Sequence, residues 1–169
     1  SGFFFHQVHL ADSKGWSLAW LASFFIGFAI GKAATLLIVG PMIDRFGAVR
    51  LLPYYPLPMA LGLLVLAVSD HPYAALPYLA GSGISTGMWL ITLGALWAEL
   101  YGVARLGAIR SMAQSIFIFS VALGTAAMGW MLDLGITFEA IALASVVYLA
   151  VSIAPSMWLA HRRSQPATG

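Results

Sequence analysis

The sequence predicts an all-α membrane protein, a bundle of five full transmembrane helices preceded by one truncated helix. Of its 169 residues, 61% are hydrophobic and only 8% are charged. The mean hydropathy of +0.91 is far above that of a soluble domain of this length. The apolar stretches are continuous runs of Leu, Ile, Ala, Phe and Gly without a period of two, which favours helices over barrel strands.

The first apolar segment is too short to cross a bilayer. As a helix, residues 3–11 would span about 14 Å, under half of a hydrocarbon core of about 30 Å. The segment lacks an initiator Met, a basic start and a small-residue cleavage site, so it does not predict a signal peptide. We expect the last half of a helix whose beginning is missing.

Five further stretches each reach the roughly 20 residues that a transmembrane helix needs. They cover residues 16–40, 51–69, 73–98, 107–131 and 137–160. The predicted bundle therefore fills residues 1–163, and residues 164–169 form a tail. Two pairs of small residues, Gly27 with Gly31 and Gly83 with Gly87, predict close helix contacts.

The distribution of basic residues predicts the orientation. One set of loops carries every arginine: Arg45, Arg50, Arg105, Arg110, Arg162 and Arg163. The opposite loops carry Asp12, Asp70, Asp133 and Glu139, with Lys14 as their only lysine or arginine. Because cytoplasmic loops are enriched in Lys and Arg, we expect the arginine loops and the C-terminus to be cytoplasmic, in a plasma membrane or a bacterial inner membrane.

Composition also excludes several function classes. The net charge of +2 comes from eight basic and six acidic residues, and no basic run is dense enough to cover a phosphate backbone, so nucleic acid is not an expected partner. Without any Cys, the chain has no disulfide and no thiolate metal site. Neither a cofactor nor a metal is predicted.

A charged segment between the first two long helices carries the most specific motif. Residues 40–50 contain Gly40, Asp44, Arg45, Gly47 and Arg50, spaced G-x-x-x-D-R-x-G-x-x-R. We interpret this segment as a short hinge whose glycines permit a tight reversal and whose acid faces Arg45, Arg50 or the N-terminal end of a neighbouring helix. The spacing closely resembles the cytoplasmic loop signature of the major facilitator superfamily of secondary transporters.

The resemblance implies that the chain is the C-terminal half of a twelve-helix transporter. Its partners would be the lipid bilayer, the missing N-terminal six-helix half and a small-molecule solute. The Gly40, Asp44 and Gly47 pattern has an echo in Gly129, Asp133 and Gly135, as two inverted repeats of three helices would produce. A second charged cluster of the superfamily is matched by Glu99, Arg105 and Arg110, with a gating role or a purely topological one.

Lys32 is the most informative residue inside a predicted span. It lies 12 positions after Trp20 and 12 before Asp44, about 18 Å from each, and so at the bilayer midplane. A Lys there costs roughly 2.5 to 3.5 kcal/mol on insertion scales. The resemblance implies that this helix borders a central cavity and that a basic residue on it holds a substrate carboxylate. The alternative is a fixed ion pair with an acid of the missing half.

Other polar side chains inside the predicted spans are weaker candidates. Ser85 and Trp89 share a helix face and could form a hydrogen-bonding and aromatic wall, or Ser85 could bond within its own helix. His6 and His9 could line a cavity and couple transport to protons, or have no role at the interface. Two histidines without a third ligand do not predict a metal site.

The predicted function is alternating-access transport of a small organic solute, in particular an organic anion such as a monocarboxylate or dicarboxylate. A non-transporting sensor or assembly module on the same scaffold is one alternative. Another is a proton-coupled exporter of drugs or other hydrophobic solutes. An enzyme is not expected, because Ser82, between Gly81 and Gly83, has no predicted base nearby.

Overall fold

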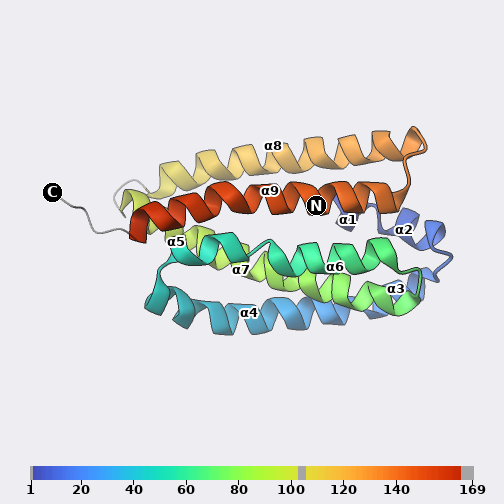
Figure 1. The fold of residues 1–169 in the computed structure, drawn as a ribbon, viewed down its shortest axis with the longest axis horizontal. Helices are drawn as coiled ribbons and strands as arrows, with labels where there is room; N and C mark the ends of the chain where they lie inside the picture. The colour runs from blue at the N-terminus through green and yellow to red at the C-terminus, as the bar shows by residue number, and fades with distance from the viewer. Residues whose placement is uncertain (1, 103–105, 165–169) are drawn as a thin grey trace.

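The part of the chain that the structure describes is all-helical and has the long apolar helices of an integral membrane protein, which confirms the predicted fold class at that level. The computed structural model describes residues 2–102 and 106–164, and there it contains helices and turns but no strand. Five helical segments are long and apolar enough to cross a membrane: Leu18–Phe46, Ala48–Val68, Pro72–Tyr101, Leu106–Asp133 and Phe138–Trp158. They run along one common direction, so most reversals of the chain gather at the two ends of the bundle (Figure 1).

The first two predicted helices are each interrupted once. Residues 3–11 fall in α1 (Gly2–Phe5) and α2 (Gln7–Ser13), which meet at His6. The predicted helix 16–40 consists of α3 (Leu18–Ser23) and α4 (Phe25–Phe46), which meet at Phe24. The Ser17 side chain begins α3 by accepting a hydrogen bond from the Trp20 N–H at 3.1 Å.

The charged segment of residues 40–50 is mostly helical, which corrects its interpretation as a short hinge. α4 continues through Pro41 to Phe46, and the reversal is made at Gly47 with a φ of 85°. A proline disfavours helical geometry in the preceding residue by a clash with that residue's backbone N–H and Cβ. Gly40 has no Cβ and avoids part of this clash, and α4 continues through Pro41 to end at Phe46, as α9 continues through Pro155.

Prolines divide the predicted helix 51–69, which is a second correction. The chain forms α5 (Ala48–Leu51), the 3-10 turn η1 (Leu52–Tyr54) and α6 (Leu57–Val68). Pro53, Pro56 and Pro58 have no backbone N–H to donate to a helix ladder. A proline is tolerated in the first turn of a helix, where N–H groups have no intrahelical acceptor, and Pro58 occupies that place in α6.

The last three predicted helices differ from the structure by only a few residues at each end. They correspond to α7 (Ala75–Tyr101), α8 (Leu106–Asp133) and α9 (Phe138–Ser164), and the 3-10 turn η2 (Pro72–Ala74) leads into α7. Ser164, the first residue of the predicted tail, still belongs to α9. Residues 165–169 lie outside the described residues.

Glycines allow α7 to lie directly against α4 and α6. A Cβ at Gly87 would lie 2.9 Å from the Thr35 Cβ, and one at Gly31 would lie 2.8 Å from the Ala80 carbonyl oxygen. At Gly62 of α6, a Cβ would lie 2.7 Å from the Pro77 carbonyl oxygen. Because no side chain fits at such distances, helix backbones meet there, and the predicted close contact through small residues is confirmed.

The two ends of the bundle carry different charges. The lysine end, defined by Lys14, Asp70 and Glu139, contains the turns between α2 and α3, α6 and η2, and α8 and α9. The arginine end, defined by Arg45, Arg50 and Arg110, contains the turn between α4 and α5, the start of α8 and the end of α9 (Figure 1). Buried apolar side chains form a separate cluster toward each end.

Candidate functional site

Lys32 occupies the centre of its helical segment. It lies midway between Leu18 and Phe46, the bounds of a 29-residue segment, so about 21 Å of helix separates it from either end. The side chain of a lysine is far too short to reach a membrane surface from there. Its ammonium lies 6.0 Å from the centroid of the Phe28 ring, one turn earlier on α4.

The Lys32 ammonium has no acidic partner among the residues that the structure describes. All six acidic residues belong to the described residues, and none of them forms an ion pair with Lys32. The Phe28 ring beside the amine packs in turn against Phe4 of α1, with ring centroids 5.4 Å apart. A cation–π contact contributes about 0.5 to 2 kcal/mol, less than the cost of a central lysine in a bilayer.

Ser85 and Trp89 contact different neighbours and do not converge on Lys32. The buried Ser85 hydroxyl accepts a hydrogen bond from the Met59 N–H at 2.9 Å, in the first turn of α6. The Trp89 ring packs against Phe117 of α8, with centroids 4.6 Å apart. The predicted hydrogen-bonding and aromatic wall is therefore divided between two helix interfaces.

The two histidines differ in their surroundings. His6 is half-buried, with Nδ1 3.0 Å from the Gly2 carbonyl oxygen and Nε2 beside Gly129 of α8, while His9 is exposed. Among the described residues, no third His, Cys, Asp or Glu joins them in a cluster that could hold a metal ion. His6 therefore connects the first helix to α8 by contact, and His9 has no such neighbour.

Three buried polar atoms lack a hydrogen-bond partner among the described residues. They are the Gln7 Nε2, the Ser82 Oγ and the Thr92 Oγ1. Leaving a buried polar group unpaired costs about 1 to 3 kcal/mol, so each atom marks a place where a solute, a water molecule or another conformation would add stability. Thr92 was not singled out by sequence; its only signal was a hydroxyl within an apolar helix.

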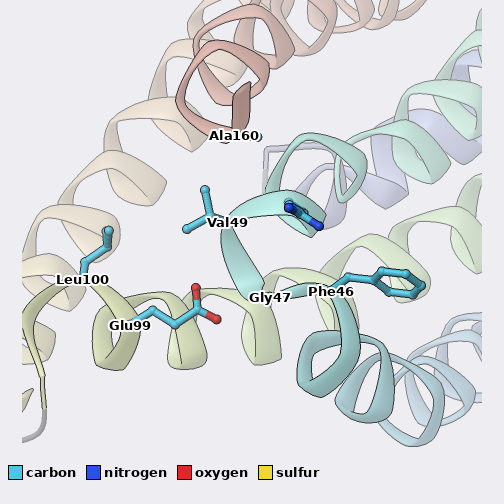
Figure 2. A pocket seen from close by; sticks show the side chains of 7 residues that line it. Phe46, Gly47, Val49, Glu99, Leu100 and Ala160 are labelled. Atoms are coloured by element: carbon cyan, nitrogen blue, oxygen red, sulfur yellow. The ribbon is translucent and has the colours of Figure 1, made fainter. Parts of the chain in front are cut away.

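At the arginine end, Glu99 binds backbone rather than an arginine. Its Oε1 accepts a hydrogen bond from the Ala48 N–H at 2.7 Å, the first N–H of α5. Figure 2 shows the Glu99 carboxylate pointing from α7 toward the turn at Gly47, beside a cavity of about 380 Å³. Because the first N–H groups of a helix have no intrahelical acceptor, Glu99 fixes the position of α5 after the turn.

The remaining charges of the loop motif are not paired with one another. Asp44 and Arg50 are exposed, and neither forms an ion pair with a described residue. The Arg45 guanidinium lies 5.3 Å from the ring centroid of Phe46. Gly40 lies within α4 with open space beside it. These charges are free to bind water, lipid or another protein surface.

The predicted cluster of Glu99 with two arginines is only partly described. Arg105 lies outside the described residues. Arg110 forms no ion pair with Glu99 or with any other described acid; instead its Nη2 lies over Gly94 of α7, 3.4 Å from the position that a Cβ would take. Arg110, Trp89 and Phe117 line a second cavity, of about 80 Å³.

Lys14 is the centre of a charged cluster that the sequence analysis missed. Its ammonium donates to Asp70 at 2.6 Å, to Glu139 at 3.1 Å and to the Ser69 carbonyl at 3.3 Å, and its side chain is 1% exposed. Burial by itself would lower the pKa of Lys14, but the hydrogen bonds and charges of Asp70 and Glu139 together raise it above 10.5.

A signal for this cluster was present in the sequence. Lys14 is the only lysine or arginine in loops that otherwise carry acids, and a lone cation among acids at one end of a bundle is placed to pair with them. Comparison with known proteins adds no further residue, because no family model, curated protein or solved structure matches this chain.

Proposed function

We propose that this chain is the C-terminal half of a secondary active transporter of the major facilitator type, and that it moves a small organic anion such as a monocarboxylate or dicarboxylate. The observation that carries the proposal is the Lys32 ammonium, midway along a membrane-spanning segment and without an acidic partner among the described residues. The spacing of the loop motif from Gly40 to Arg50 supports the choice of superfamily.

Electrostatics favours an anionic solute at Lys32. In water, an ammonium and a carboxylate 4 Å apart attract by only about 1 kcal/mol, and the attraction grows as water is excluded. A lysine ammonium is a compact charge with three donors, so it can bind one carboxylate from several directions. An anion bound there would offset much of the roughly 2.5 to 3.5 kcal/mol that a central lysine costs.

A second six-helix bundle would complete the cavity around Lys32. Secondary transporters bind their solutes near the midplane between repeats, and one bundle rocks against the other. The Gly40, Asp44 and Gly47 pattern ends α4 at the arginine end, and the related pattern of Gly129, Asp133 and Gly135 ends α8 at the lysine end. Two patterns at opposite ends support an inverted repeat of three helices. The excess of arginines supports a cytoplasmic C-terminus.

The unpaired buried atoms on α7 support a transport cycle with more than one packing arrangement. Ser82 and Thr92 lie on the helix that touches both α4 and α6. A second packing arrangement that gave these hydroxyls hydrogen-bond acceptors would recover part of the cost of burying them.

Counterflow into proteoliposomes tests the function directly. The protein that contains this chain, with its second bundle, is reconstituted and assayed with labelled monocarboxylates and dicarboxylates. Lys32→Gln keeps hydrogen bonding but removes the charge, and we expect it to weaken anion binding at least about tenfold. Lys32→Arg should retain part of the binding. Arg45→Gln, which removes a cation at the arginine end, is the matched control and should leave affinity unchanged.

The outcome that contradicts the proposal is equally specific. Unchanged affinity and exchange in Lys32→Gln would assign the amine a structural role, as the partner of an acid in the second bundle. Absence of exchange for every solute in a broad panel would instead favour a sensor or an assembly module. Exchange of neutral hydrophobic solutes alone would favour an exporter.

A further inference from the structure

The groove between α7 and α8 has an aromatic wall and one basic end. Trp89 and Trp97 of α7 and Phe117 of α8 line it, together with Arg110 and Gln114. The Trp89 and Phe117 rings are tilted against each other, with centroids 4.6 Å apart and an interplanar angle of 31°. An apolar object lying along this wall would contact rings on both helices.

Arg110 supplies the polar end of the groove. Gly94 has no side chain, which leaves room for the guanidinium to lie over α7. All six acids of the chain lie among the described residues, and none forms an ion pair with Arg110. Arg110 lies about 6 Å along α8 from Leu106, close to the arginine end, so the groove joins an exposed cation to the apolar part of the span.

The size of the cavity limits the kind of ligand. Its volume is about 80 Å³. Pockets that enclose a whole small molecule measure about 300 to 1,000 Å³, so a soluble organic anion would remain mostly uncovered here. A ligand whose remaining atoms lie in the bilayer has no such difficulty. The groove therefore suits an amphiphile with one anionic group at Arg110 and an apolar chain along the rings.

We propose that this groove is a binding site for an anionic phospholipid, with its phosphate at Arg110 and Gln114 and an acyl chain against Trp89 and Phe117. A guanidinium can donate two parallel hydrogen bonds to a phosphate, and it attracts an anionic lipid more strongly than a neutral one. Basic pockets between transmembrane helices bind anionic headgroups, and Trp rings such as Trp97 suit the headgroup boundary. The site is separate from Lys32 and does not depend on the proposed transport.

Tryptophan quenching measures this binding. The chain, in neutral detergent micelles at about 0.15 M salt, is titrated with phosphatidylglycerol or phosphatidylcholine that carries bromine on its acyl chains. We expect phosphatidylglycerol to quench at lower concentrations. Arg110→Gln should weaken that binding about tenfold, as expected for a lost hydrogen bond between charged groups. Arg110→Lys should weaken it less. Replacing Trp89 and Trp97 with Phe should remove the quenching that saturates first.

Arg45→Gln is the matched control, because it removes an exposed cation from the same end. It should change the binding of phosphatidylglycerol less than about twofold. Equal losses in Arg45→Gln and Arg110→Gln would mean a diffuse surface charge and overturn the proposal. Wild-type affinity in Arg110→Gln would overturn it as well. Competition by glycerol phosphate, which has no acyl chain, would identify a free phosphate site in place of a lipid site.

Discussion

The lysine end and the arginine end of the bundle use their charges in opposite ways. At the lysine end, one buried ammonium binds Asp70 and Glu139, and the Trp16 indole donates to the Asp70 carbonyl at 2.9 Å. At the arginine end, Arg50 and Arg110 are exposed and no described acid pairs with either. One end is held together by its own charges, while the other offers its charges to the surroundings.

This difference indicates which end of the bundle has charges available for binding other molecules. Lys14 joins the first helix to the loop after α6 and to the start of α9, so three separate segments are fixed by one side chain. Exposed charges contribute only about 0 to 1 kcal/mol by pairing with each other. The charges at the arginine end therefore add little to folding and remain available to lipid, to solute or to a second bundle.

The largest expected effect comes from removing the cation of the lysine end. Lys14→Met should lower the free energy of unfolding by about 1 to 2 kcal/mol, because the buried ammonium loses its hydrogen bonds, while water screens its exposed partner Asp70. Unfolding of the purified chain in mixed micelles measures the change. The comparison would fail if Arg45→Met, which removes an exposed cation at the arginine end, destabilised the chain by the same amount.

The ion pairs of Lys14 predict that the free energy of unfolding depends on pH. The pKa of Lys14 is raised above 10.5 by Asp70 and Glu139. A raised pKa of a base means that its stabilisation is complete below the unfolded value and is lost as pH rises through the folded value. The difference in unfolding free energy between wild type and Lys14→Met should therefore stay constant from about pH 7 to pH 9 and shrink above 10.5. A difference that vanished near pH 7 would contradict the assignment of the stabilisation to Lys14.

Much of the fold followed from the sequence because membrane helices leave a simple pattern. Long apolar runs located all five spans, and small residues such as Gly87 located the contact between α4 and α7. The errors in the predicted helix ends came from glycines and prolines, which occur both in turns and within helices. Gly40 and Gly47 looked alike in sequence, yet only Gly47, with a φ of 85°, makes the turn, because α4 continues through Pro41.

The candidate site was less accessible to sequence reasoning. The central position of Lys32 could be predicted by counting residues, since the rise of a helix is constant. The hydrogen bond of Ser85 could not be predicted, because it depends on which helix packs against that face of α7, and there it is α6. Lys14 could be counted as a lone cation, but its burial depends on three segments meeting in space.

A smaller effect is expected from the single polar contact that orders the arginine end. Glu99→Ala removes the acceptor of the Ala48 N–H, and we expect a loss of about 1 kcal/mol, typical for the loss of a helix cap. Glu99→Gln retains an acceptor and should lose less. Both are measured by the same unfolding assay. A loss larger than that of Lys14→Met would show that the arginine end is the more strongly fixed of the two.

The smallest effect on stability should follow from Asp44→Asn. Asp44 is exposed and has no ion pair among the described residues, so the free energy of unfolding should change by less than about 0.5 kcal/mol. If the arginine end binds a second bundle during transport, the same substitution should still slow exchange, because the lost charge is needed only in that contact.

Asp133→Asn removes the related acid at the lysine end and is the matched control. Counterflow and unfolding measured on both variants separate the two effects. Slower exchange in Asp44→Asn alone, at unchanged stability, would support a partner at the arginine end. Wild-type exchange in Asp44→Asn would mean that the Asp44 carboxylate makes no contact that exchange requires.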